Sequence, residues 1–83
     1  DNVLVFERLD KKGNVMLVVL NFSQYDYHNY GFNVDNGKYE LVLNSDDLKY
    51  GGRGVDVAET LTSDAGYVEV VMPASSVQYY KKV

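Results

Sequence analysis

Ser23, Asp26 and His28 form the closest approach to an acid–base set in this sequence, because a hydroxyl, a carboxylate and an imidazole follow one another within one short segment. Polar residues of this kind are common in any loop, and a single loop histidine is usually solvated. His28 is the only histidine, and cysteine is absent. We therefore predict that the chain contains no catalytic residue.

Two other segments carry groups that could bind an ion. Oxygen-bearing side chains occupy Asn44–Asp47, but their spacing matches no calcium loop and is typical of a turn. Gly51-Gly52-Arg53-Gly54 lacks the Lys-Ser/Thr of a phosphate-binding loop, so we expect its glycines to allow a tight turn or a close backbone contact. Zinc sites built from cysteines or several histidines are excluded. We predict no metal and no cofactor.

The tyrosines are stronger candidates for binding. Tyr25, Tyr27 and Tyr50 fall in segments expected to be loops. An exposed tyrosine ring can stack on a sugar ring while its hydroxyl forms hydrogen bonds, so these three residues are candidates for glucan stacking. The alternative is that they cover the ends of the domain or contact another domain.

Length and charge restrict the partners. The 83 residues predict a single domain, 1–83, with a net charge of -4. That charge argues against binding to nucleic acid or to an anionic membrane surface, and the longest apolar run, Val15 to Leu20, is far below the roughly 20 residues that span a bilayer. The absence of cysteine fits a reducing compartment, and we expect the cytoplasm. A strand directly at Asp1-Asn2 suggests a piece of a longer protein.

Most of the chain has strand character, since β-branched and aromatic residues alternate with polar ones between turn signals. These patterns predict an all-β fold, an antiparallel β-sandwich of seven or eight strands with a Greek-key-like crossover. The long polar segment Asn44–Gly54 suits a crossover between sheets. The expected strands cover residues 2–8, 14–22, 30–35, 39–43, 55–62, 67–72 and 76–82.

Asn36-Gly37 is the clearest turn signal. This dipeptide favours a type I′ turn, which needs positive φ at both central residues. A hairpin on this turn would place Asp35 opposite Lys38, and Val34 opposite Tyr39.

The second expected strand is apolar on both faces. Met16, Val18, Leu20 and Phe22 share one face, whereas Val15, Leu17 and Val19 share the other. An outer sheet face normally alternates with polar residues. We therefore expect another domain to cover the face formed by Val15, Leu17 and Val19, unless long side chains of neighbouring strands shield it.

Several segments occur together in an order that resembles a known family. They are Val3-Leu-Val-Phe-Glu-Arg8, Val18-Val-Leu-Asn-Phe-Ser23, Gly37-Lys-Tyr39, Asn44-Ser-Asp-Asp-Leu-Lys-Tyr-Gly-Gly52 and Val71-Met-Pro73. The series resembles the C-terminal all-β domain of α-amylase-superfamily enzymes, most of all that of 1,4-α-glucan (glycogen) branching enzymes. The resemblance spans nearly the whole chain, and Asn44–Gly52 is its most specific part.

The resemblance implies that this domain is non-catalytic. In that family a separate (β/α)8 barrel cleaves the α-1,4 bond and forms the α-1,6 link of glycogen, while the C-terminal domain stabilises or orients the barrel and contacts glucan in some members. The candidate barrel-docking residues are Val15, Leu17, Val19, Ser45, Asp46, Tyr50, Gly51 and Gly52. The stretch from Gly52 to Tyr67 is shorter than in the common bacterial branching-enzyme pattern, which leaves open another hydrolase of the superfamily.

Overall fold

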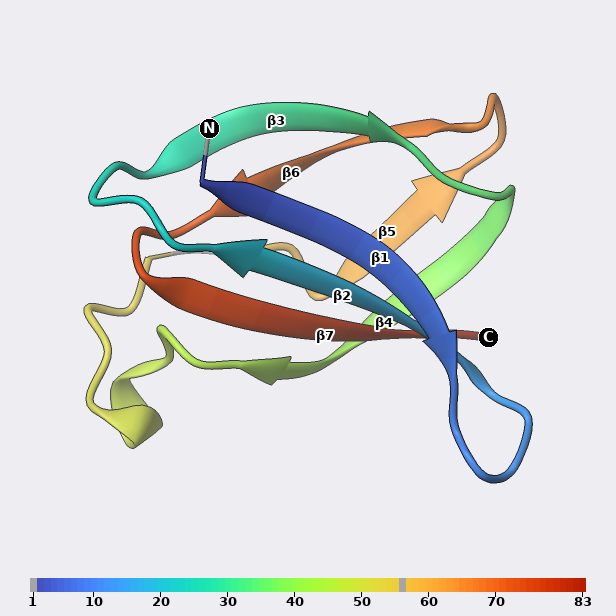
Figure 1. Ribbon diagram of the computed structural model, residues 1–83, viewed down its shortest axis with the longest axis horizontal. Helices are drawn as coiled ribbons and strands as arrows, with labels where there is room; N and C mark the ends of the chain where they lie inside the picture. The colour runs from blue at the N-terminus through green and yellow to red at the C-terminus, as the bar shows by residue number, and fades with distance from the viewer. Residues whose placement is uncertain (1, 56) are drawn as a thin grey trace.

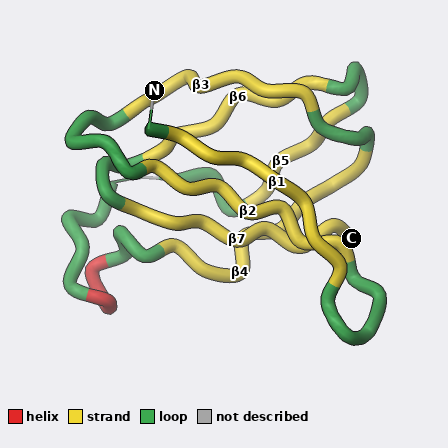
Figure 2. Tube along the Cα trace, in the orientation of Figure 1, coloured by secondary structure: helices red, strands yellow, loops and turns green. Residues whose placement is uncertain are grey.

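The computed structural model describes residues 2–55 and 57–83, and in these ranges it is built almost entirely from strands (Figures 1 and 2). One antiparallel sheet has the strand order β1-β2-β7-β4-β5, and a two-stranded sheet pairs β3 with β6. The strands are β1 (Val3–Leu9), β2 (Val15–Asn21), β3 (Tyr27–Asn33), β4 (Gly37–Asn44), β5 (Thr60–Ser63), β6 (Tyr67–Met72) and β7 (Ser76–Lys82). The prediction of an all-β antiparallel sandwich is confirmed.

The chain passes repeatedly between the two sheets. It leaves the large sheet after β2, returns at β4, leaves again after β5 and returns at β7. The last strand therefore lies between β2 and β4 in the middle of the large sheet (Figure 1). This arrangement agrees with the predicted Greek-key-like crossover.

The predicted hairpin at Asn36-Gly37 is wrong. The strands on either side of it, β3 and β4, belong to different sheets, and Ser75 is the one non-glycine with positive φ among the described residues. The Asn36 Oδ1 instead accepts a hydrogen bond of 2.8 Å from the Gly66 N–H. The chain between Val34 and Tyr39 therefore crosses from the two-stranded sheet to the large sheet, and both side chains enter the core.

The expectation for Asn44–Gly54 also needs correction. β4 and β5, which the segment joins, pair with each other in the same sheet, so it is no crossover. It contains the 3₁₀ helix η1 (Leu48–Tyr50), and the next strand starts at Thr60 rather than at Val55.

The core lies between the two sheets, and it overturns the predicted faces of β2. Leu17 and Val19 are each 1% exposed and belong to the core cluster, so they are not available for docking. Asn21, on the same face, reaches into the interior and donates hydrogen bonds to the Met72 and Pro73 carbonyls at 3.0 and 3.2 Å. The core consists of Leu17, Val19, Val34, Tyr39, Leu61, Val68, Val70, Met72 and Tyr80.

Candidate functional site

The large sheet presents apolar side chains on the side that faces away from the core. The registers of β1, β2 and β7 place Leu4 beside Leu20 and Val77, and Phe6 beside Val18 and Tyr79. Residues directly opposite each other on neighbouring strands project from the same face of a sheet. We call this surface the outer apolar face; it comprises Leu4, Phe6, Val18, Leu20, Phe22, Leu43, Val77 and Tyr79.

Much of this face is open to solvent. Phe22 is 65% exposed, and Leu4, Phe6 and Tyr79 are also exposed. The two-stranded sheet differs, since its own outer side carries Gly31, Asn33 and Glu69 beside Tyr67. The domain therefore has one ordinary polar sheet face and one apolar sheet face. Exposed apolar patches of this kind are typical of surfaces that bind a partner.

A β-bulge in β4 extends the outer apolar face. Leu41 pairs with the core residue Tyr80, whereas Leu43 pairs with Tyr79, so Val42 is the extra residue between them. Val42 lines a surface hollow together with Met16 and Lys81. The bulge thus leaves two consecutive apolar side chains on the outer side of the sheet.

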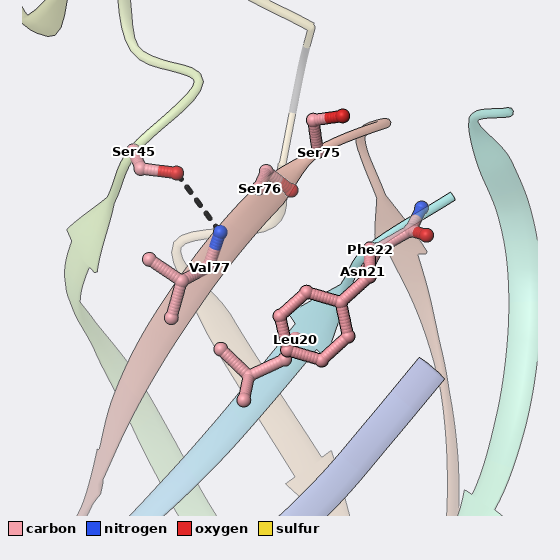
Figure 3. Close-up of a pocket in the computed structure, with 7 residues that line it drawn as sticks. All are labelled: Leu20, Asn21, Phe22, Ser45, Ser75, Ser76 and Val77. Carbon is pink, nitrogen blue, oxygen red and sulfur yellow. Dashed lines mark hydrogen bonds between the residues drawn. The ribbon is translucent and has the colours of Figure 1, made fainter. Parts of the chain in front are cut away.

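A second hollow, of about 410 Å³, lies at the opposite end of this face. Figure 3 shows Leu20 and Phe22 beside Val77 at its floor, with Ser45 on the neighbouring loop. The Ser45 hydroxyl accepts a hydrogen bond of 2.9 Å from the Val77 N–H. None of its lining residues is an acid or a base, so the hollow lacks the groups for acid–base catalysis. Its apolar residues are better suited to contact an apolar side chain.

The segment Asn21-Phe22-Ser23 divides into buried and exposed parts. The Asn21 Oδ1 accepts hydrogen bonds from the Ser23 amide at 2.9 Å and from the Ser23 hydroxyl at 2.7 Å. Both residues are buried and fasten the end of β2. Phe22, between them, points outward onto the hollow.

The loop after β4 folds around a buried carboxylate. Asp46 Oδ2 accepts a hydrogen bond of 2.9 Å from the Val55 N–H, and the Gly54 N–H donates to the Asp46 carbonyl at 2.7 Å. A Cβ atom on Gly52 would collide with the Asp46 backbone, so this glycine permits close approach to its own loop. Asp46 and Gly52, both predicted to dock, are therefore occupied in shaping the loop.

The 3₁₀ helix η1 has regular caps and exposed side chains. Asp47 caps its start through a 3.0 Å hydrogen bond from the Lys49 N–H, and Gly51 ends it with a φ of 81°. Tyr50 remains exposed, with the Lys49 ammonium 5.2 Å from its ring centre. Of the loop residues predicted to dock, Tyr50 and Gly51 are exposed, Ser45 and Gly52 are half-buried, and Asp46 is buried.

The three candidate tyrosines do not form one set. Tyr25 is 72% exposed and lies in the loop between β2 and β3, as predicted. Tyr27 is the first residue of β3, and its half-buried ring packs edge-on against Tyr30 with ring centres 5.5 Å apart. The structure therefore leaves Tyr25 and Tyr50 as exposed loop tyrosines.

An ion pair joins the two loops that carry Tyr25 and Tyr50. The Arg53 guanidinium donates to both carboxylate oxygens of Asp26, and the Ala74 N–H donates to the same carboxylate at 2.8 Å. The hydrogen bond from Arg53, followed by that from Ala74, holds the pKa of Asp26 below its usual 3.8. Asp26 is thus engaged in structure, while His28 is an exposed residue of β3.

Within residues 2–55 and 57–83, no group of three His, Cys, Asp or Glu side chains is arranged to hold a metal ion. The same residues contain no helix with the length and hydropathy needed to cross a membrane.

These features define a small antiparallel β-sandwich domain that presents one apolar sheet face. The family model for the alpha amylase C-terminal all-beta domain matches residues 1–83. This chain belongs to that family. It is also 32% identical, over 96% of its length, to the 1,4-alpha-glucan branching enzyme GlgB of Vibrio parahaemolyticus serotype O3:K6 (strain RIMD 2210633). The match spans 12% of the length of that enzyme.

The prediction that β2 is apolar on both faces is confirmed, but the face predicted to lie outside, that of Leu17 and Val19, is the one in the core. The signal that identifies the inner face is Asn21, since a polar side chain at the strand end with several backbone partners must point inward. It shares its face with Leu17 and Val19, which leaves Val18 and Leu20 outside. Val15, the third residue of the predicted face, is half-buried at the start of β2.

Proposed function

We propose that this chain is the non-catalytic C-terminal domain of a 1,4-α-glucan branching enzyme, and that it stabilises or orients the catalytic (β/α)8 barrel of the same protein. Support comes from the family match and from the similarity to a branching enzyme that is far longer than this chain. The parent would cleave an α-1,4 bond and transfer the glucan to form an α-1,6 link.

The observation that carries the proposal is the outer apolar face. Water-facing sheet positions rarely hold a continuous set of leucine, valine and aromatic side chains, because exposing apolar surface to water is unfavourable in free energy. Here Leu4 and Phe6 on β1 and Tyr79 on β7 are all exposed, on either side of β2. Packing against a barrel would remove this area from water.

A pair of tyrosine substitutions tests the proposal in the full-length protein. Tyr79 and Tyr67 are both exposed strand residues, 37% and 49% respectively, but they project from opposite sheets. We expect Tyr79→Ser to lower the melting temperature of the barrel and to shorten the half-life of branching activity several-fold at elevated temperature. Tyr67→Ser, the matched control, should change both much less.

Equal effects of the two substitutions on the barrel would contradict docking through the large sheet. A melting temperature that falls only for the transition of the small domain would also contradict it, because the loss would then be confined to the sandwich.

A second candidate function is direct contact with α-glucan. It is favoured by the exposure of Tyr25 and Tyr50 on two loops that the Asp26–Arg53 ion pair joins. Amide-resolved NMR during titration with a linear malto-oligosaccharide tests it. Saturable shifts at Tyr25 and Tyr50, abolished by Tyr25→Ala, would support a binding module, whereas unchanged spectra at millimolar sugar would exclude it.

A further inference from the structure

The outer apolar face has a basic end. Four of the eight lysine and arginine residues line one hollow of about 650 Å³, located where β1 and β2 are joined by a loop. These cations are Arg8, Lys11, Lys12 and Lys81. The concentration is notable because the whole chain carries a net charge of -4.

The acidic groups near this hollow offset only part of its positive charge. Asp10 Oδ1 accepts hydrogen bonds of 2.8 Å from the amides of Lys12 and Asn14, and Lys81 attracts the Asp10 carboxylate electrostatically. Glu40 lies opposite Lys81 in the register of β4 and β7. Among the described residues, the ion pairs all belong to Arg53, so the four cations have no direct carboxylate partner.

The basic end is continuous with the apolar face. Met16 lies between Arg8 on β1 and Lys81 on β7, in the row next to that of Phe6, Val18 and Tyr79. The other end of the face, at Leu20, Phe22 and Val77, has no charged residue in its hollow. In Figure 1 the β1–β2 loop and the β2–β3 loop project from opposite ends of the molecule. The outer apolar face therefore has a positively charged end and an uncharged end along the direction of its strands.

We propose that the surface docked on the outer apolar face belongs to the remainder of the same protein, and that it bears aspartate or glutamate side chains over Arg8, Lys11, Lys12 and Lys81. This inference rests on the proposed function. Two observations identify the partner surface. The match covers 12% of the branching enzyme that this chain resembles, so most of that enzyme lies outside the matched region. The cations of the basic end also require a partner of opposite charge. Charges at the border of an apolar contact fix its orientation, because the reversed arrangement leaves the cations unpaired.

Zero-length carbodiimide cross-linking of the full-length protein, mapped by mass spectrometry, tests the inference, because this reagent joins an amine to a carboxylate in direct contact. We expect Lys11, Lys12 or Lys81 to be linked to carboxylates outside these 83 residues. Lys49, an exposed lysine on η1 away from the β1–β2 loop, is the internal control and should give at least several-fold fewer such links.

A mixture of isotope-labelled and unlabelled protein identifies the source of each linked carboxylate. Links between differently labelled chains would overturn the inference in favour of a second copy. Links confined to Asp10 and Glu40, or none, would also overturn it.

A charge reversal supplies an independent readout. Lys11→Glu with Lys12→Glu should lower the melting temperature of the full-length protein more at low salt than at high salt, whereas Lys49→Glu should have little effect. If Tyr79→Ser impairs the barrel as expected but no lysine forms links, docking stands and the acidic partner surface is wrong. If Tyr79→Ser also has no effect, the proposed function itself fails.

Discussion

At the scale of single residues, the polar side chains of the loops are used mostly to hold the loops in place. Asp46 accepts amide hydrogen bonds inside its own loop, Asn21 fastens the end of β2, and Asp26 joins two loops through Arg53. These roles account for side chains that in sequence could suggest a metal site or an acid–base pair. Exposed apolar residues such as Phe22, in contrast, do not contribute to the core of the domain.

The Asp26–Arg53 pair gives a prediction about pH. Because the folded-state pKa of Asp26 is below its unfolded value of 3.8, its contribution to stability is fully present above pH 3.8. It is lost as the pH falls through the lowered folded pKa. We expect urea denaturation to show that Arg53→Ala is less stable than the wild type at neutral pH and that this difference shrinks below pH 3.8. A difference that stays constant down to the acid unfolding limit would contradict the ion pair.

At the scale of elements, β2 shows what alternation can predict and what it cannot. Its pattern identifies a strand with two apolar faces, but periodicity alone does not say which face is internal. That choice depends on partners distant in sequence, such as the carbonyls of Met72 and Pro73 that bind Asn21. Strand β6 has polar residues on one face only, and there alternation alone identifies Val68, Val70 and Met72 as the inner residues; all three are buried.

Substitutions in β2 test the corrected faces. Leu17→Ala should destabilise the domain by about 2–5 kcal/mol, because it opens a cavity in the core, whereas Leu20→Ala should cost about 1 kcal/mol or less. Urea denaturation of the 83-residue chain measures both. In the full-length protein the cost of Leu20→Ala should rise, since docking buries it. A larger loss of unfolding free energy for Leu20→Ala than for Leu17→Ala would contradict this assignment and favour the arrangement predicted from sequence, in which Leu17 lies on the outer face.

The errors at Asn36-Gly37 and Asn44–Gly54 have a common physical cause. Turn chemistry and loop length are local signals, but membership of a sheet is decided by long-range pairing. Asn36 has the residue type of a type I′ turn, yet its amide oxygen accepts a hydrogen bond from Gly66 in the neighbouring loop between β5 and β6. The prediction that the glycines after Asp47 permit a tight turn and a close backbone contact is confirmed, and the backbone that Gly52 approaches is that of its own loop.

At the scale of the whole molecule, the two sheets have different outward surfaces. The outer side of the two-stranded sheet is mainly polar, whereas the large sheet carries Leu4, Phe6 and Tyr79 on the outside and a basic end at the β1–β2 loop. The proposed docking against a larger domain rests on this difference and on the similarity to a branching enzyme of which the match spans 12%. We therefore place the function of the chain on the outer apolar face, which would contact a partner domain, rather than in a pocket that binds a small molecule.

Side-chain footprinting of the full-length protein with a short-lived carbene tests this central claim most directly, because it needs no substitution. Tyr67 and Tyr79 are comparably exposed in the domain itself and provide an internal comparison. The account predicts strong labelling of Tyr67 and several-fold weaker labelling of Tyr79, Phe6 and Phe22. Labelling of Tyr79, Phe6 and Phe22 at the level of Tyr67 would show that the outer apolar face is uncovered and would contradict docking.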